Sequence, residues 1–526
     1  MPSGALTQIK HKGSEDVYLT GNPSITFFKH SFQRYTNFAC EWIHECFEGS
    51  KPLQTTSRIR KQIKIRRHGD LLSNVALVFD LPNIYSTYEE NFKWVDNIGH
   101  MLIKSTEFII GGQVISKLYG QWMNIWYELI TPESKRKGFN TLIGNIEELT
   151  SPVRYHGTID EAKYPTINKK RLRIPLPFWF TENPALALPL IAIQYTDIYI
   201  NFDFLALNDL FTIGKPSVNP RELFENPDTS SASNHINLKK EFELENYGYD
   251  TIFWKFVNGR NGPGMWNQNM YMDCEYIFLD EEERKIFASA TSEYLVTQVE
   301  RIDRDGLHGS FQEDIEFFHP VKEMIWVFQR SDVYIRNQWT NYTNFVHNKD
   351  YINYKEITNK YHILENFGLA PINILQYILP SGMNVSQFEE LLYNSDEEKT
   401  PLVHSDAFNT YGNIMYFGEF MFNTHSRQIA KSDIFYRTEP YRTHTNYPNK
   451  TIYSYSFSLD PEKFQPSGTA NFSQYSKSQF RATLQETKNP EEDSNEEKLT
   501  YSMFFYVRNL NILRIQGGLA NLVFAN

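Results

Sequence analysis

Alternation of hydrophobic and polar positions recurs along the whole chain. Runs with an apolar side chain at every second position predict strands, because successive side chains of a strand point to opposite faces. We predict strands at Ser73–Leu81, Tyr195–Phe204, Tyr271–Leu279, Glu323–Gln329, Ile452–Leu459 and Tyr501–Ile515. Clusters of Asn, Gly, Pro and Asp lie between these runs, as expected for turns. Many short strands with few helical patterns favour an all-β protein made of sandwiches or barrels.

Two segments show features of helices. Apolar residues recur at helical intervals in Lys117–Leu129. Asp280 precedes three consecutive glutamates, and we expect it to cap a helix that runs through Glu293, since negative charge is favourable in a first turn. That helix lies between two strand-rich halves of similar length. The pattern therefore predicts two β domains joined by a linker helix at residues 281–293.

Polar segments interrupt the strand pattern at residues 208–237 and 329–410. Structureless segments this long are uncommon in compact domains unless they form exposed loops or binding surfaces. A third polar segment, Gln485–Lys498, is acidic, and we interpret it as a solvated hairpin tip. Gly111 and Gly112 lie between two apolar runs and predict a hairpin turn.

Composition agrees with β structure and limits the classes of function. The 526 residues include 39 Phe and 32 Tyr, which supply enough apolar area for packed cores and favour strands. A net charge of −11 argues against a protein whose main role is to coat DNA, because such proteins are usually basic. The N-terminal residues lack the apolar stretch of a secretory signal, and Ala185–Ile193 is too short to span a bilayer. We therefore expect a soluble protein made in the cytoplasm.

Motifs for catalysis or metal binding are missing from the sequence. The 14 histidines are dispersed, and neither a zinc-binding spacing, a phosphate-binding loop nor a nucleophile elbow is found. Cys40, Cys46 and Cys274 have no paired spacing, and we expect free, buried thiols in a reducing compartment. The sequence thus predicts no catalytic residue, no cofactor and no metal ion.

One basic run, Arg58–Arg67, admits two interpretations. Most of its charged side chains share one face of a predicted strand, while its isoleucines share the other. This face could bind anions such as lipid headgroups, nucleic acid or an acidic partner. It could also be a solvated face that protects a sheet edge, which is the interpretation we favour.

Four asparagines stand in acceptor motifs for N-linked glycans: Asn341, Asn384, Asn449 and Asn471. Such motifs matter only if the chain meets the secretory machinery. The sequence leaves open whether any of them carries a sugar.

Seven collinear blocks extend from one end of the chain to the other: Gly13–Ala39, Ile109–Trp122, Ile174–Ile200, Cys274–Glu300, His319–Gln329, Ile452–Ser473 and Leu510–Asn526. Together they resemble the major capsid proteins of nucleocytoplasmic large DNA viruses. The chain departs from that pattern at Ala470, where the family often has a Cys.

The resemblance implies an all-β double jelly roll, which is two consecutive eight-stranded jelly rolls with a short linking helix. It implies an N-terminal arm at 1–25, a first jelly roll at 26–280, the helix at 281–293 and a second jelly roll at 294–526. Residues 208–237 and 329–410 would then be exterior loops. Separately, we expect Trp179 and Trp326 to be core residues, in which case replacing either by Ala should destabilise the protein.

The same resemblance implies a structural protein of the virion, without enzymatic activity, that forms homotrimeric capsomers of pseudo-hexagonal outline. These would tile an icosahedral capsid. Its partners would be other copies of the chain, neighbouring capsomers and minor capsid proteins, with an inner viral membrane nearby and no direct nucleic acid contact.

Two other classes of function stay open at this stage. A jelly-roll module could bind glycans, alone or in a spike, through aromatic-rich loops. A cupin-like or glycosidase jelly roll would need a metal ion or paired carboxylates. A trimeric mass in solution would distinguish the capsomer from a monomeric binder or enzyme.

Overall fold

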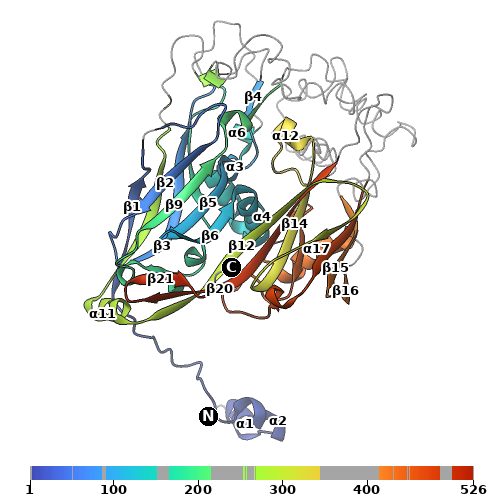
Figure 1. The fold of residues 1–526 in the computed structure, drawn as a ribbon. Helices are drawn as coiled ribbons and strands as arrows, with labels where there is room; N and C mark the ends of the chain where they lie inside the picture. Colours follow the sequence, from blue (N-terminus) through green and yellow to red (C-terminus); the bar gives the residue numbers. More distant parts are fainter. Residues whose placement is uncertain are drawn as a thin grey trace, which may run out of the picture.

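The computed structural model describes residues 3–49, 51–85, 91–150, 165–214, 268–343, 414–423, 425–429, 432–446, 451–485 and 500–524, with 253–254, 256–257, 266 and 448. The chain folds into two β-sandwiches that lie side by side (Figure 1). An N-terminal arm leaves the body at one end of the molecule (Figure 1).

The first sandwich consists of two antiparallel sheets with four principal strands each, in the orders β1-β11-β3-β7 and β2-β9-β5-β6. Their bounds are β1 Phe38–Cys46, β2 Ile59–Ile65, β3 Leu71–Leu81, β5 Ile103–Ile110, β6 Gln113–Tyr119, β7 Lys170–Pro175, β9 Ile198–Phe204 and β11 Tyr271–Leu279. The short strand β8 (Leu188–Pro189) also pairs with β3, while β4 (Asn91–Trp94) and β10 (Phe211–Gly214) form a separate ribbon.

The second sandwich has sheets in the orders β12-β20-β14-β17 and β13-β19-β15-β16. Their bounds are β12 Ser292–Leu307, β13 Ser310–Asp314, β14 Pro320–Arg330, β15 Met415–Phe422, β16 His425–Ile429, β17 Tyr453–Ser456, β19 Ser478–Leu484 and β20 Tyr501–Gln516. Two short strands, β18 (Ala470–Asn471) and β21 (Leu519–Leu522), extend the first of these sheets.

Both sandwiches have the same topology. When the eight principal strands of each are numbered in chain order, one sheet reads 1-8-3-6 and the other reads 2-7-4-5 in both sandwiches. This arrangement of two packed Greek keys is the jelly roll. The predicted fold class, two consecutive eight-stranded jelly rolls, is therefore confirmed.

The linker helix is α11 (Glu281–Ser289), and the Asp280 side chain accepts a hydrogen bond from the Glu281 amide at 2.8 Å, as an N-cap. The predicted end at Glu293 is wrong. The helix ends at Ser289, because Ser292 and Glu293 already pair with Ile515 and Arg514 of β20.

The other helix was predicted three residues too early. Lys117 to Tyr119 belong to β6, which pairs with β5, and α4 spans Gly120–Ile130. A Cβ at Gly120 would lie 2.1 Å from the carbonyl oxygen of Ile103, so only glycine fits where the strand turns into the helix. Within the described residues, the other α-helices with printed bounds are α1 Ser3–Lys10, α2 Ser14–Thr20, α3 Ile98–Leu102, α5 Glu133–Ile143, α6 Glu147–Thr150, α12 Val333–Arg336 and α17 Ser432–Thr443.

All six predicted strands are observed, and β11 has the predicted bounds. The predicted hairpin turn is also present: Gly111 and Gly112 connect β5 to β6 with φ values of +58° and +86°. Side chains with a Cβ rarely adopt such angles, which explains the glycine pair.

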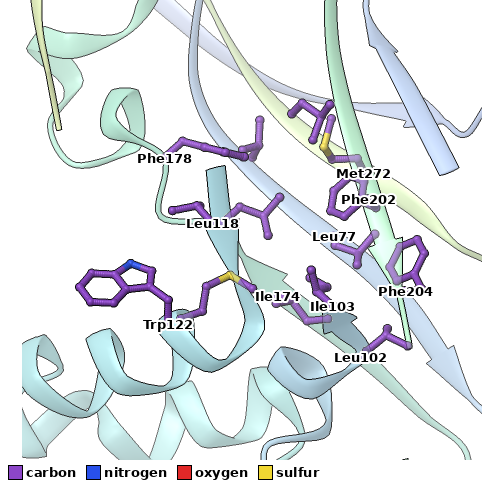
Figure 2. Close-up of a cluster of buried hydrophobic side chains, with 14 of the residues drawn as sticks. Leu77, Leu102, Ile103, Leu118, Trp122, Ile174, Phe178, Phe202, Phe204 and Met272 are labelled. Atoms are coloured by element: carbon purple, nitrogen blue, oxygen red, sulfur yellow. The ribbon is translucent and has the colours of Figure 1, made fainter. Parts of the chain in front are cut away.

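Each sandwich has an aromatic-rich core. In the first, Phe202 and Phe204 of β9 lie near Leu77 of β3 and Met272 of β11 (Figure 2). In the second, Trp326 of β14 stacks on Tyr453 and on Phe505, with ring centroids 5.7 and 5.4 Å apart. Trp179 and Trp326 are 1% and 0% exposed, so their predicted burial is confirmed.

The structure corrects the start of both predicted loop excursions. Phe211–Gly214 forms β10, and β14 extends to Arg330. The side-chain nitrogen of Asn337 donates to the carbonyl oxygens of Asn208 and Phe211 at 2.9 and 2.8 Å. The beginnings of both predicted loops therefore belong to the folded body. Residues 215–237 and 344–410, like the acidic segment 486–498, lie outside the described residues.

Candidate assembly surfaces

Every residue from 4 to 42, which covers the N-terminal arm and the start of β1, is exposed. It contains aromatic side chains that no part of the described chain covers, with Phe27, Phe28 and Phe32 exposed to 90%, 98% and 85%. A contiguous exposed apolar segment marks a site of interaction. Within the described residues, the first strand is β1, which begins at Phe38.

Strand β1 continues the arm along the rim of the first sandwich (Figure 1). It is an edge strand whose register with β11 is unbroken from Phe38–Leu279 to Cys46–Tyr271. Its sequence contains no Lys, Arg or Pro, which are the residues that usually protect a sheet edge from pairing. Phe38 and Trp42 are 54% and 42% exposed. This rim has the features of an interface.

A chain of contacts orders the outward face of this rim. The Arg173 guanidinium lies 4.2 Å from the ring centroid of Trp42, and Arg173 Nε donates to Asp273 Oδ2 at 3.0 Å. The other oxygen of Asp273 lies 2.6 Å from His44 Nδ1, and the His44 ring packs edge-on against Tyr271. Tryptophan, tyrosine and arginine held in place by such contacts are typical of interaction hot spots.

Strand β2 contains most of the basic run and is likewise an edge strand. Two of its three charges are paired within the chain: Arg60 Nη2 lies 2.6 Å from Glu107 Oε2, and Lys64 Nζ lies 2.9 Å from Asp197 Oδ2. Arg67 donates to the carbonyl oxygens of Ile193 and Thr196. These pairs support the interpretation of a protected edge over that of an anion-binding surface.

A buried cluster of charged groups joins the two sandwiches. The Glu323 carboxylate accepts a hydrogen bond from Arg508 Nη1 at 2.8 Å, and its other oxygen lies 3.0 Å from Nε2 of His444. Arg508 also lies 3.2 Å from Glu182 of the first sandwich. Burial alone would raise the pKa of Glu323, but His444 and Arg508 outweigh it and lower that pKa to about 2.

Around this cluster, β6 packs against β12 and α4 packs against β20. The Tyr506 hydroxyl donates to Gln121 Oε1 at 2.6 Å, and Gln298 Nε2 donates to the Ile115 carbonyl at 2.6 Å. Arg301 lies 4.4 Å from the ring centroid of Tyr119. The junction thus pairs the fifth strand of the first sandwich, and the helix after it, with the first and eighth strands of the second.

Within the described residues, His, Cys, Asp and Glu side chains do not gather in any group of three or more that could hold a metal ion. The described helices include none long and apolar enough to cross a membrane.

A cavity of about 20 Å³, room for a single water molecule, lies beside His100 and Asn97. The His100 ring stacks on Tyr127 at 5.4 Å, and burial lowers the pKa of His100 to about 3.

The predicted burial of the cysteines holds only for Cys274. All three thiols are free, but Cys40 and Cys46 are exposed on β1, because the strand lies at the rim. Of the glycan acceptor motifs, Asn341 is 1% exposed and accepts hydrogen bonds from Thr343, whereas Asn471 is exposed. Asn384 and Asn449 lie outside the described residues.

Sequence reasoning missed both the rim and the junction. The available clue to β1 was the segment FACEWIHEC, in which Phe38 and Trp42 fall on one face of a strand and no Lys, Arg or Pro protects the edge. The junction offers no local clue, since Glu182, Glu323 and Arg508 are far apart in the chain.

Comparisons with known proteins agree with this architecture. Residues 26–280 match the family model for the major capsid protein N-terminus, and residues 283–521 match that for the large eukaryotic DNA virus major capsid protein. The chain is 28% identical to the major capsid protein of Phaeocystis pouchetii virus and 26% identical to that of Paramecium bursaria Chlorella virus 1, in each case over the full length of both chains.

Solved structures show the same fold. The subunit in the PBCV-1 virus capsid matches with a TM-score of 0.61 and 22% identity, covering 95% of this chain and 100% of that one. The Faustovirus major capsid protein matches with a TM-score of 0.60 and 12% identity, covering 96% and 94%. The two family models, the full-length relatives and the repeated jelly roll lead to one conclusion: the chain belongs to the major capsid proteins of large eukaryotic DNA viruses, which are structural proteins of the virion.

Proposed function

We propose that three copies of this chain form a capsomer of pseudo-hexagonal outline, and that these capsomers tile an icosahedral capsid. The observation that carries the proposal is the repeated topology. Each chain supplies two jelly rolls with the same strand order, so a closed ring of three chains presents six similar units. Six similar units around one axis suit hexagonal packing on a shell.

The exposed arm and the β1 rim support self-association. An apolar segment such as Phe27–Phe28 is costly to leave in water, at about 25 cal/mol per Å² of apolar surface. Burial against neighbouring capsomers or minor capsid proteins would recover this free energy. The arm would lie at the base of the capsomer, on the side of an inner viral membrane.

The protein has a structural role, and we propose that it performs no catalysis and uses no cofactor. The clustered polar groups at the junction support this view, because Glu323, His444 and Arg508 satisfy one another and are closed off from solvent. The net charge of −11 favours a shell that does not contact nucleic acid directly. We also propose that the chain is made in the host cytoplasm before it enters the virion.

Size-exclusion chromatography with light scattering tests the capsomer. We expect a mass three times 61.9 kDa at micromolar concentration. A monomer at every concentration would refute the proposal and would favour a monomeric glycan-binding module, for which a glycan array is the direct assay.

A further inference from the structure

The part of the N-terminal arm nearest the first sandwich combines exposed apolar side chains with positive charge. We call residues 25–35 the aromatic segment. Five of its apolar side chains are at least 70% exposed: Ile25, Phe27, Phe28, Phe32 and Tyr35. Lys29 and Arg34 lie among them and are exposed as well. The chain has no acidic residue between Asp16 and Glu41, so this stretch is cationic in a protein of net charge −11.

The backbone of the aromatic segment limits where the segment can lie. Residues 21–37 are all described, and they form neither a helix nor a strand. The Phe28 amide donates to the Thr26 hydroxyl at 3.3 Å, which makes only a local turn. Peptide groups outside helices and sheets need water or another polar partner, and the hydrocarbon core of a bilayer provides neither. The segment therefore suits a boundary between polar and apolar surroundings.

The spread of the rings favours a lipid surface over a protein surface. Phe27 and Phe28 are neighbours in the chain, and at 90% and 98% exposure neither ring packs on the other. A protein surface meets such a segment from one side and would leave part of these rings in water. The headgroup layer of a bilayer surrounds an inserted chain, so each ring reaches apolar material. Aromatic side chains accompanied by Lys or Arg are typical of segments that lie in this layer.

The cations determine the kind of lipid. Lys29 and Arg34 have no acidic residue near them in the sequence, and the negative surface potential of an anionic bilayer attracts such charges. Nucleic acid would attract them too, but two phosphate contacts give only weak binding. The aliphatic side chain of Ile25 would also stay in water on nucleic acid, whereas a bilayer would cover it.

The position of the arm allows this contact without bringing the body to the lipid. Phe38 pairs with Leu279, so the arm leaves the body beside the first turn of α11 (Figure 1). That turn carries the exposed Glu281 and Glu282, which an anionic surface repels. The ten residues from Phe28 to Phe38 can span roughly 33 Å when extended. The rings can therefore reach a bilayer that the acidic body does not touch.

We propose that the aromatic segment binds the surface of an anionic lipid bilayer, with its rings at the depth of the headgroups and with Lys29 and Arg34 close to lipid phosphates. The contact itself needs only one chain. Its strength on a particle rests on the proposed trimer, because the second and third arms of one capsomer bind at a high effective concentration after the first.

Flotation of the full-length protein with vesicles tests the lipid contact. One set of vesicles contains equal parts of phosphatidylserine and phosphatidylcholine, and the other contains phosphatidylcholine alone. We expect the protein to float with the first set and to bind the second at least tenfold more weakly. High salt should weaken binding to the anionic vesicles, because it screens the charges of Lys29 and Arg34.

A first variant removes rings without changing the charge. Phe27→Ser combined with Phe28→Ser should lower the affinity for anionic vesicles at least tenfold, because two apolar side chains no longer enter the headgroup layer. The matched control is Leu459→Ser combined with Phe524→Ser, which removes side chains of the body that are 80% and 54% exposed. The control should bind vesicles like the wild type. Thermal melting shows that both variants are folded.

A second variant removes charge without changing the rings. Lys29→Gln combined with Arg34→Gln should lose most of the preference for phosphatidylserine and keep the weak binding to phosphatidylcholine. Lys285→Gln combined with Lys463→Gln removes two cations from the body, where their side chains are 73% and 72% exposed. This control should keep the full preference.

The outcomes separate the lipid contact from the trimer. A wild-type chain that binds neither kind of vesicle overturns the lipid contact, as does a folded Phe27, Phe28 variant with unchanged binding. Equal binding to both kinds of vesicle overturns the role of the cations. Binding of a single-stranded oligonucleotide in place of vesicles would identify the aromatic segment as a nucleic acid site. A monomer by light scattering that still floats overturns the trimer alone, and a trimer that does not float overturns the lipid contact alone.

Discussion

The Arg508 guanidinium lies 3.8 Å from the ring centroid of Trp126, and this contact joins β20 of the second sandwich to α4 of the first. The arginine is 2% exposed and also pairs with Glu323 and Glu182. One side chain thereby connects a cation–π contact, a buried ion pair and the boundary between two domains.

Arg508→Met should destabilise the protein by ~3–5 kcal/mol, because it removes the guanidinium that pairs with the buried Glu323 carboxylate. Urea unfolding at neutral pH measures the change. Arg514→Met removes an exposed partner of Glu293 and should cost ~0–1 kcal/mol. Equal effects of the two substitutions would show that the junction contributes no more than a surface pair.

The Glu323 carboxylate makes stability depend on pH in the acid range. Its pKa is about 2 in the folded chain against 4.5 when unperturbed, so the unfolded chain takes up a proton first as the pH falls. The free energy of unfolding that Glu323 contributes is fully present above about pH 4.5 and is lost as the pH falls towards 2. Urea midpoints recorded across this window should fall steeply for the wild type and less steeply for Glu323→Gln. An equal pH dependence of the two urea midpoints would contradict a lowered pKa of Glu323 in the folded chain.

His100 acts in a higher pH window. Burial between Tyr127 and Phe139 holds its pKa near 3, below the unperturbed value of 6.5, so the folded chain keeps the imidazole neutral. The free energy of unfolding that depends on the neutral His100 is fully present above about pH 6.5 and declines as the pH falls towards 3. His100→Phe should remove part of that decline, whereas His308→Phe, at an exposed position, should retain the wild-type slope.

The strands were predictable because their cores impose alternation. In β9, the residues from Ile198 to Phe204 alternate strictly between buried and partly exposed positions, and the sequence shows the same period. The linker helix was predictable from Asp280, since capping is a local interaction. The order of strands and the family followed from the resemblance rather than from periodicity.

The junction was not predictable, because it depends on how two finished sandwiches pack. Asn124 donates to the Tyr342 hydroxyl at 3.1 Å across 218 positions of sequence, and neither residue has a local pattern that marks it. The same holds for residues 329–343, whose polar sequence suggested a loop. Trp339 Nε1 donates to the Asp209 carbonyl at 2.7 Å, so a contact with the other sandwich determines their place.

The core tryptophans give a direct test of the two sandwiches. Trp326→Ala and Trp179→Ala should each cost ~3–5 kcal/mol, because each removes a fully buried indole and leaves a cavity. Trp42→Ala, at 42% exposure on the rim, should cost the isolated monomer less. Chemical unfolding of the three variants supplies the comparison, and wild-type stability of Trp326→Ala would exclude the observed packing.

Deletion of Gly13–Asn22 separates folding from assembly. The deleted segment contains α2, and all of its residues are exposed, so the melting temperature should not change. Trimers should still form, because the deleted residues lie outside both sandwiches. Shell assembly should be impaired, because the arm loses the apolar side chains of Val17 and Leu19, which are 59% and 87% exposed.

The double substitution Val17→Ser and Leu19→Ser keeps the length of the arm and should reproduce the defect in electron micrographs of assembled particles. Normal shells from the truncated chain would mean that residues 13–22 have no part in joining capsomers, and would leave that role to Phe27, Phe28 and Phe32, which the truncated chain retains.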